Sequence, residues 1–118
     1  MNWTNPANKF RNKKTEVDGI VFDSKKESGI YLDLKAQKAA GQIRDFERQK
    51  VYVLIPKQCD ESGKCVERAC TWTADFVVYF HDGEISVVDA KGNKSLDQKW
   101  PIKRKLMLWV HGIKVKEV

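Results

Sequence analysis

Hydrophobic and polar residues recur with two different periods along the chain, and each change of period marks a new element. Residues 24–40 follow the helical period of 3.6. Ser24 is a favourable N-cap, and Gly41 is a favourable residue to end a helix. The pattern therefore predicts a helix over residues 24–40. One line along this helix consists of Glu27, Ile30, Tyr31, Leu34 and Lys38.

Three extended segments follow, over residues 43–55, 66–80 and 84–91. Their apolar residues alternate or run continuously, as in half-buried or buried strands. The polar stretch 57–64 predicts a hairpin tip between the first two, and His81-Asp82-Gly83 predicts a tight turn before the third. A bend or bulge is expected in the first strand near Glu47-Arg48.

A second helix is predicted over residues 99–110, followed by a short last strand over residues 113–118. Pro101 suits the first turn of this helix, and Gly112 ends it. Its apolar stripe is expected to consist of Ile102, Leu106 and Trp109. The element order is thus αβββαβ, which predicts an α/β fold with a mixed central sheet flanked by helices.

The length of 118 residues fits one domain, which we assign to residues 19–118. Residues 1–18 combine several cations with few apolar anchors and are predicted to form a basic, flexible arm. This arm is either a solvated tail or a DNA-contacting segment. No stretch approaches the ~20 apolar residues of a membrane span. We therefore expect no membrane partner and a location in the cytoplasm.

The chain carries 22 Lys and Arg against 16 Asp and Glu, which gives a net charge of +6. A basic domain suits a polyanion, most often a nucleic acid. Cys59, Cys65 and Cys70 are an odd number of cysteines, so a disulfide framework is not expected. A zinc site with His81 is the alternative to free thiols, but the cysteine spacing misses the usual CxxC pattern, which favours free thiols.

Two strand carboxylates are the main candidates for chemistry. Ile85, Val87, Asp89 and Lys91 share one strand face, so an apolar face turns ionic at its end. Asp75 lies on an apolar face of the preceding strand. If residue 80 pairs with residue 84 across the turn, Asp75 lies opposite Asp89. Two ionised carboxylates this close repel each other, and a divalent cation removes the repulsion.

Oxygen ligands favour Mg²⁺ or Mn²⁺ over Zn²⁺. Each acid also has a structural alternative. Glu27 is placed to complete a capping box with Ser24. Asp75 could pair with a lysine at a bulge, and Asp89 with Lys91 could form a surface ion pair.

In this order, the residues resemble the PD-(D/E)XK nuclease superfamily. Glu27 matches its acid on the first helix, Ala74-Asp75 its Pro-Asp position without the proline, and Asp89-Ala90-Lys91 its Asp-x-Lys element. From Gly19 onward the chain is similar to a small phage-type subgroup. The stretches that carry this likeness are residues 19–27, 73–76, 89–92 and 103–106.

The resemblance implies a restriction-endonuclease-like core and Mg²⁺-dependent hydrolysis of DNA, encoded by a phage or prophage and acting in the bacterial host. Asp75, Asp89 and the Ala90 carbonyl would bind the metal, with Glu27 binding it directly or through water. Lys91 would orient the attacking water. Mn²⁺ is expected to substitute for Mg²⁺, and no small-molecule cofactor is implied. Candidate DNA-binding cations are Lys9, Arg11, Lys13, Lys14, Lys25, Lys94, Lys99, Lys103 and Arg104.

Small Holliday-junction resolvases share this size and element order, so branched DNA is one expected substrate and DNA recombination one expected role. Symmetric cutting of two strands would call for a homodimer with twofold symmetry. The rivals are a sequence-specific or nicking nuclease with the same site, and a DNA-binding module that keeps the fold without cleavage.

Overall fold

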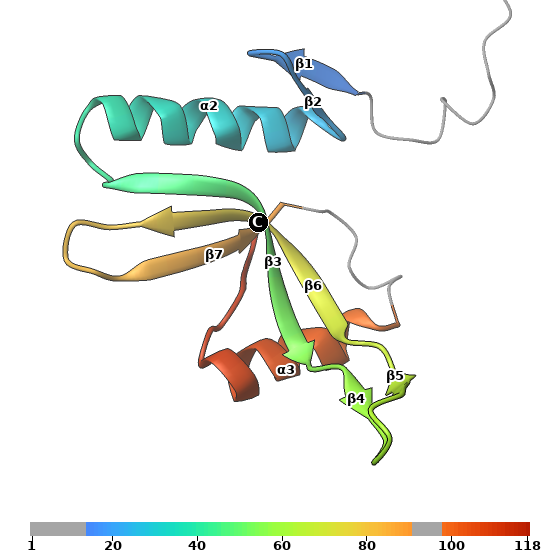
Figure 1. Ribbon diagram of the computed structural model, residues 1–118. Coiled ribbons are helices and arrows are strands. Elements are labelled where there is room, and N and C mark those ends of the chain that lie inside the picture. Colours follow the sequence, from blue (N-terminus) through green and yellow to red (C-terminus); the bar gives the residue numbers. More distant parts are fainter. Residues whose placement is uncertain (1–13, 91–97) are drawn as a thin grey trace, which may run out of the picture.

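A mixed sheet of four strands lies between two helices in the computed structural model (Figure 1). The structure describes residues 14–90 and 98–118. The strand order is β3-β6-β7-β8, with α2 (Lys25–Ala39) on one face and α3 (Trp100–His111) on the other. The predicted α/β class, the mixed sheet and its flanking helices are confirmed. The strands are β3 (Asp45–Ile55), β6 (Cys70–Tyr79), β7 (Ile85–Asp89) and β8 (Lys116–Glu117).

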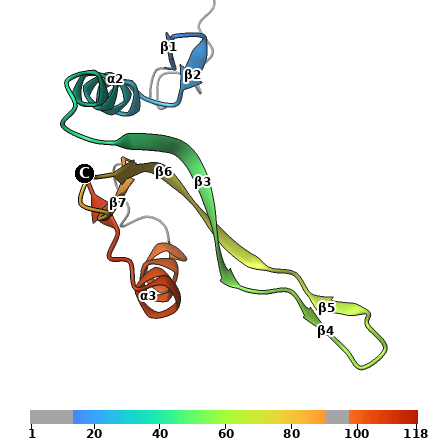
Figure 2. The same cartoon turned by 60° about the vertical axis from the view of Figure 1, so that its left-hand side comes forward.

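Two small antiparallel hairpins stand outside this sheet. One joins β1 (Thr15–Val17) to β2 (Ile20–Phe22) next to α2, so β1 takes in residues assigned above to the N-terminal arm. The other joins β4 (Gln58–Cys59) to β5 (Cys65–Glu67) at the far end of the β3–β6 ribbon (Figure 2). The return strand predicted over residues 66–80 is therefore two strands, interrupted between Glu67 and Cys70.

The first helix forms as its capping residues predict. Ser24 is the N-cap, and its hydroxyl accepts a hydrogen bond from the Glu27 backbone N–H at 3.1 Å. The helix ends one residue before the Ala40 C-cap, and Gly41 follows with φ of 77°. Tyr31 and Leu34 are buried against the sheet together with Phe22 and Phe76. This cluster forms the core on the α2 side.

The β3–β6 ribbon changes its buried face near Asp75. Ala74 packs in the core on the α3 side, whereas Phe76 packs in the core on the α2 side. In a regular strand, residues two apart face the same way, so the pattern of facing residues shifts here by one position. Opposite this point, Gln49 has a positive φ of 52°, and both strands curve sharply (Figure 2). The bend predicted near Glu47-Arg48 thus occurs at the next residue.

The second helix shows that its predicted apolar stripe is wrong at two of its three residues, since only Leu106 packs against the core. Ile102 is 63% exposed and Trp109 is 84% exposed, whereas Trp100 and Met107 are buried. Apolar residues occur on several sides of this helix, so periodicity alone could not choose the buried side. The choice follows from tertiary contacts: the rings of Trp100 and Trp72 lie 5.3 Å apart, and Trp100 Nε1 donates to Glu117 Oε1 at 2.8 Å.

Candidate functional site

Asp75 and Asp89 lie next to each other on neighbouring strands. The β6–β7 register pairs Phe76 with Val88 and Val77 with Val87, and Phe80 N–H donates to Glu84 O at the turn. Continued by one residue, this register puts Asp75 opposite Asp89, as predicted. Both residues are 1% exposed. Since opposite residues have Cβ atoms about 5 Å apart, the pair forms a compact, buried acidic site.

Backbone and side-chain donors hold the Asp75 carboxylate in place. The Ala90 N–H donates to Asp75 Oδ2 at 2.8 Å, and Gln49 Nε2 approaches Asp75 Oδ1 at 3.5 Å. Within residues 14–90 and 98–118, Asp75 forms no ion pair with a lysine or arginine. The donors are therefore neutral, and they fix the carboxylate without neutralising it. The structural alternative of a lysine partner for Asp75 finds no support in this part of the chain.

Glu27 is buried on the first turn of α2, with 4% of its surface exposed. Its Oε2 accepts from the Asp23 N–H at 3.3 Å, while its own N–H donates to Ser24. This is close to the capping box considered above, with the preceding residue's N–H in place of that of Ser24. Glu27 Oε1 is buried and has no hydrogen-bond partner among the described residues. Glu27 thus caps the helix, and its second carboxylate oxygen is available to bind a metal or a water molecule.

The described residues contain no group of three or more His, Cys, Asp or Glu side chains close enough to hold a metal ion. Glu27 is therefore not gathered with Asp75 and Asp89 into a three-carboxylate site in this structure. The donor chemistry of the aspartate pair alone fits Mg²⁺, which prefers one or two carboxylates and keeps several waters.

Of the rest of the predicted motif, the structure describes Ala90 but not Lys91. Ala90 is buried at the end of β7, whereas Lys91 and Lys94 lie outside the described residues. The part assigned to the Ala90 carbonyl and to Lys91 stays a prediction.

An open groove of about 280 Å³ runs between α2 and the β7–β8 edge of the sheet. Lys26 and Lys116 supply its cations, and Val88, the residue before Asp89, lies along it. The groove thus passes β7, the strand that carries Asp89. Asp33 also lines the groove, so its walls carry two basic side chains against one acidic side chain. This excess of positive charge suits an anionic ligand.

The candidate DNA-binding cations divide into three groups. Lys14 and Lys25 are exposed near the β1–β2 hairpin and at the start of α2. Lys99, Lys103 and Arg104 belong to α3 or its N-cap, and Lys103 is half-buried. Lys9, Arg11 and Lys13 lie outside the described residues.

Sequence reasoning missed two residues near the acidic pair. Gln49 gave no signal, because a glutamine in a strand has no distinctive pattern; only the register places it opposite Asp75. Arg48 is half-buried, its Nε has no hydrogen-bond partner among the described residues, and its guanidinium carbon lies 4.6 Å from the centre of the Phe22 ring. Such a cation–π contact joins segments that are distant in sequence, so it could not be read from spacing.

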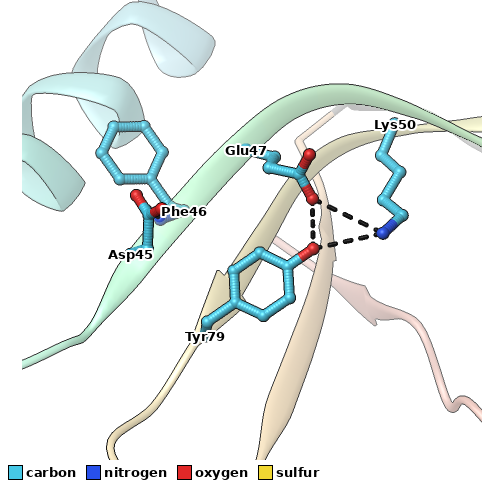
Figure 3. A network of polar contacts seen from close by, with 5 residues as sticks. All are labelled: Asp45, Phe46, Glu47, Lys50 and Tyr79. Carbon is cyan, nitrogen blue, oxygen red and sulfur yellow. Dashed lines mark hydrogen bonds and ion pairs between the residues drawn. The ribbon is translucent and has the colours of Figure 1, made fainter.

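A polar network fastens β3 to β6 beside this region (Figure 3). The Tyr79 hydroxyl donates to Glu47, and Lys50 Nζ lies 3.2 Å from the Tyr79 hydroxyl and 3.5 Å from Glu47. The hydrogen bond from Tyr79 holds the pKa of Glu47 below its ordinary value. The same tyrosine raises the pKa of Lys50. The network therefore stays charged near neutral pH and supports the ribbon.

The cysteines and histidines lie away from the acidic pair. Cys59 and Cys65 are exposed at the far hairpin, Cys70 is half-buried, and all three are free thiols. His81 Nε2 lies 2.8 Å from Gly41 O, and His111 Nε2 lies 2.8 Å from Val53 O. Both histidines thus contact backbone carbonyls, at a turn and at a helix end.

Comparison with known families supplies a classification. A family model described as "Protein of unknown function (DUF1064)" matches residues 7–116, which is nearly the whole chain. The chain belongs to the DUF1064 family. No curated protein and no solved structure matches it. Within the described residues, no helix is both long and apolar enough to cross a membrane.

Proposed function

We propose that this protein is a Mg²⁺-dependent DNA endonuclease of the PD-(D/E)XK kind. The observation that carries the proposal is the pair of buried carboxylates, Asp75 and Asp89, on adjacent strands. Burying two like charges side by side costs free energy and has no benefit for packing. A divalent cation offsets that cost and brings hydrolytic chemistry.

The surrounding residues support this reading. The element order around the pair is helix, three antiparallel strands, helix and a parallel strand, and Glu27 is buried on the first helix. Lys91 follows Asp89 by two residues. A non-catalytic DNA-binding module would gain nothing from a buried acidic pair, because carboxylates repel phosphate.

The residues divide the work of hydrolysis as follows. Asp75, Asp89 and the Ala90 carbonyl would hold Mg²⁺, with Glu27 joining them through water. Bound Mg²⁺ supplies Lewis acidity to the scissile phosphate and lowers the pKa of a water. The Ala90 N–H and the Gln49 amide orient the Asp75 carboxylate before substrate binds. Lys91 would donate from its ammonium group to the attacking water and offset negative charge in the transition state.

Branched DNA is the substrate that we propose within this class. A small basic domain that cuts both strands of a junction would work as a twofold-symmetric dimer. Sequence-specific cutting or nicking of duplex DNA would use the same site. The substrate is therefore identified by comparing the cleavage of DNAs of different structure.

The proposal is tested by incubating the protein with Mg²⁺ and five DNAs: supercoiled plasmid, linear duplex, single strand, flap and four-way junction. We expect cleavage that EDTA abolishes and Mn²⁺ supports. Asp89→Asn and Asp75→Asn should each lower the rate by about 100-fold or more, since each removes charge that stabilises the metal. Glu61→Gln is the matched control, because Glu61 is an exposed carboxylate at the tip of the β4–β5 hairpin, far from the acidic pair.

The nuclease proposal would be rejected if none of the five DNAs is cleaved and if wild type and Asp89→Asn bind DNA equally well. The protein would then be a DNA-binding module without cleavage activity. Cuts at symmetric positions in the junction would support the resolvase type. A fixed cut site in linear duplex would support the sequence-specific type instead.

A further inference from the structure

The outer side of α3 exposes an aromatic residue that most proteins would bury. Trp109 is 84% exposed, whereas Trp72 and Trp100 are 9% and 3% exposed. Leu108 and Ile102 are also exposed on this helix. Tryptophan is among the largest apolar side chains and is highly buried on average, so this much exposure is costly without a partner.

The same region concentrates the positive charge of the chain. Residues 98–116 contain six Lys and Arg and no Asp or Glu. The rest of the chain has 16 basic and 16 acidic residues, so this region accounts for the whole net charge. Lys105 precedes Trp109 by four positions, which places the two side chains on neighbouring parts of the helix surface. An open hollow of about 260 Å³ lies beside them, lined by Arg104, Lys105, Leu108 and Lys114.

Two kinds of partner could cover this face, a second copy of the chain or a polyanion, and charge favours the polyanion. A second copy packed through a twofold axis would bring Arg104 and Lys105 against their own equivalents, with no acid on the helix to offset them. A polyanion meets no such repulsion. A regular duplex offers phosphates but keeps its bases stacked, so it leaves Trp109 unused. A strand with unpaired bases offers both phosphates and base faces.

We propose that the α3 face, defined by Ile102, Arg104, Lys105, Leu108 and Trp109, binds a segment of unpaired nucleic acid. Trp109 stacks on a base, and Arg104 and Lys105 contact the adjacent phosphates. The inference deepens the proposed function, because it assigns the single-stranded part of a branched substrate to a surface separate from the acidic pair. Binding at this face needs neither metal nor cleavage.

The test measures binding in EDTA by fluorescence anisotropy, with a labelled oligothymidylate and a duplex of equal length. Trp109→Ala and Trp109→Leu are expected to weaken single-strand binding roughly tenfold or more and to change duplex binding little. Trp109→Phe should restore much of the affinity, because it restores an aromatic face. Arg104→Ala with Lys105→Ala should weaken binding to both DNAs and reduce its dependence on salt.

A second measurement reports the stacking directly. In a Trp3→Phe background, oligothymidylate should quench the exposed tryptophan, and Trp109→Phe should remove the quenching. Melting temperatures of the Trp109 variants should stay at the wild-type value, because the side chain is exposed.

Three outcomes would overturn the inference. One is unchanged single-strand binding by Trp109→Leu, another is an equal loss of duplex binding, and the third is a wild-type dimer that Trp109→Asp dissociates in sedimentation. The proposed function fails separately: no cleavage with Mg²⁺, while Trp109-dependent binding persists, would refute the nuclease and leave this face as a binding site.

The β4–β5 hairpin carries a second, independent feature, a pair of cysteines in register. Cys59 pairs with Cys65 across the hairpin, and both are exposed. The Asp60 N–H donates to Lys64 O at 2.9 Å, so Asp60 and Lys64 are a hydrogen-bonded pair of the hairpin. The two kinds of pair alternate along an antiparallel ladder, so Cys59 and Cys65 are a non-hydrogen-bonded pair. Such pairs have Cα atoms about 4.5 Å apart, within the range that a disulfide spans.

The geometry points to a dithiol that a low-molecular-weight disulfide oxidises to a bond within the hairpin. One thiolate attacks the small disulfide, releases one small thiol and forms a mixed disulfide. The second cysteine then attacks its partner's sulfur, releases the second small thiol and closes the Cys59–Cys65 bond. The two cysteines lose two hydrogens, and the oxidant gains them.

Oxidised glutathione and mass spectrometry test this chemistry. The chain should lose about 2 Da, since two thiols become one disulfide. Peptide mapping should join Cys59 to Cys65. Cys70→Ser should behave as wild type, and Cys59→Ser should stop at the mixed glutathione disulfide. Lasting glutathione adducts on wild-type Cys59 and Cys65, or a disulfide between chains, would contradict the proposal.

Discussion

Gln49 shows how one residue shapes the site without being part of the acidic pair. Its φ of 52° lies in the left-handed region, within a strand whose neighbours are extended. It lies opposite Asp75, where the ribbon changes its buried face, and its amide reaches the Asp75 carboxylate. A non-glycine residue in this conformation stores strain, which is commonly found beside functional sites.

The strain at Gln49 can be measured by substitution. Gln49→Val should lower the free energy of unfolding by about 1–2 kcal/mol relative to Gln49→Gly, because a β-branched residue tolerates positive φ poorly. Urea unfolding followed by circular dichroism gives both values. Equal stability of the two variants would mean that the backbone relaxes to an extended conformation here.

Lys91 is the other residue whose part can be separated by mutation. In the proposed mechanism Lys91→Ala should reduce DNA cleavage by about 100-fold or more, because it removes the group that offsets charge in the transition state. Mg²⁺-dependent DNA binding should stay close to wild type. A loss of binding as large as the loss of cleavage would assign Lys91 to substrate binding instead.

At the scale of elements, α3 shows where periodicity stops being informative. The helix is bounded as its proline and glycine predict, with Gly112 at the C-cap in the left-handed conformation. Its buried side is set by Trp100 and Met107, and Leu106 is the one residue of the predicted stripe that packs there. The same rotation of the helix leaves Trp109 outside.

The buried side of α3 is checked by a matched pair of variants. Met107 is fully buried, so Met107→Ala should destabilise the protein by about 2–5 kcal/mol. Leu108 is 55% exposed, so Leu108→Ala should change stability by about 0.5 kcal/mol or less. The reverse order of these two effects would show that the helix packs through its other side.

At the scale of the whole molecule, two surface carboxylates, Asp18 and Asp45, form ion pairs that link neighbouring elements of the fold. Asp18 accepts hydrogen bonds from Lys35 and Tyr31, and these bonds lower its pKa, with Lys35 having the larger effect. They join the β1–β2 hairpin to α2. A hydrogen bond from Lys38 lowers the pKa of Asp45, which joins α2 to β3. Since their folded-state pKa values are depressed, these groups stabilise the fold above their unfolded pKa values.

Acid should therefore destabilise this protein. The stabilisation from these carboxylates is complete above the ordinary carboxyl range near pH 4 and is lost as the pH falls through the depressed values. Asp18→Asn should make the free energy of unfolding less dependent on pH below about 4. Urea titrations at several pH values measure this, with Asp33→Asn as the control. An unchanged dependence in Asp18→Asn would contradict the assigned cause.

The sequence by itself determined the two helices, the main strands of the sheet and the acidic pair, but not strand β1 or the division of the return strand into β5 and β6. Period-2 alternation and a tight turn at Gly83 fix which residues of β6 and β7 face each other, so Asp75 and Asp89 could be paired from the sequence alone. These are local rules, acting over a few residues. The tertiary structure decided the bend at Gln49, the cation–π contact of Arg48 with Phe22, and the outward side of α3. Each depends on which distant surfaces pack together, and no local pattern encodes that choice.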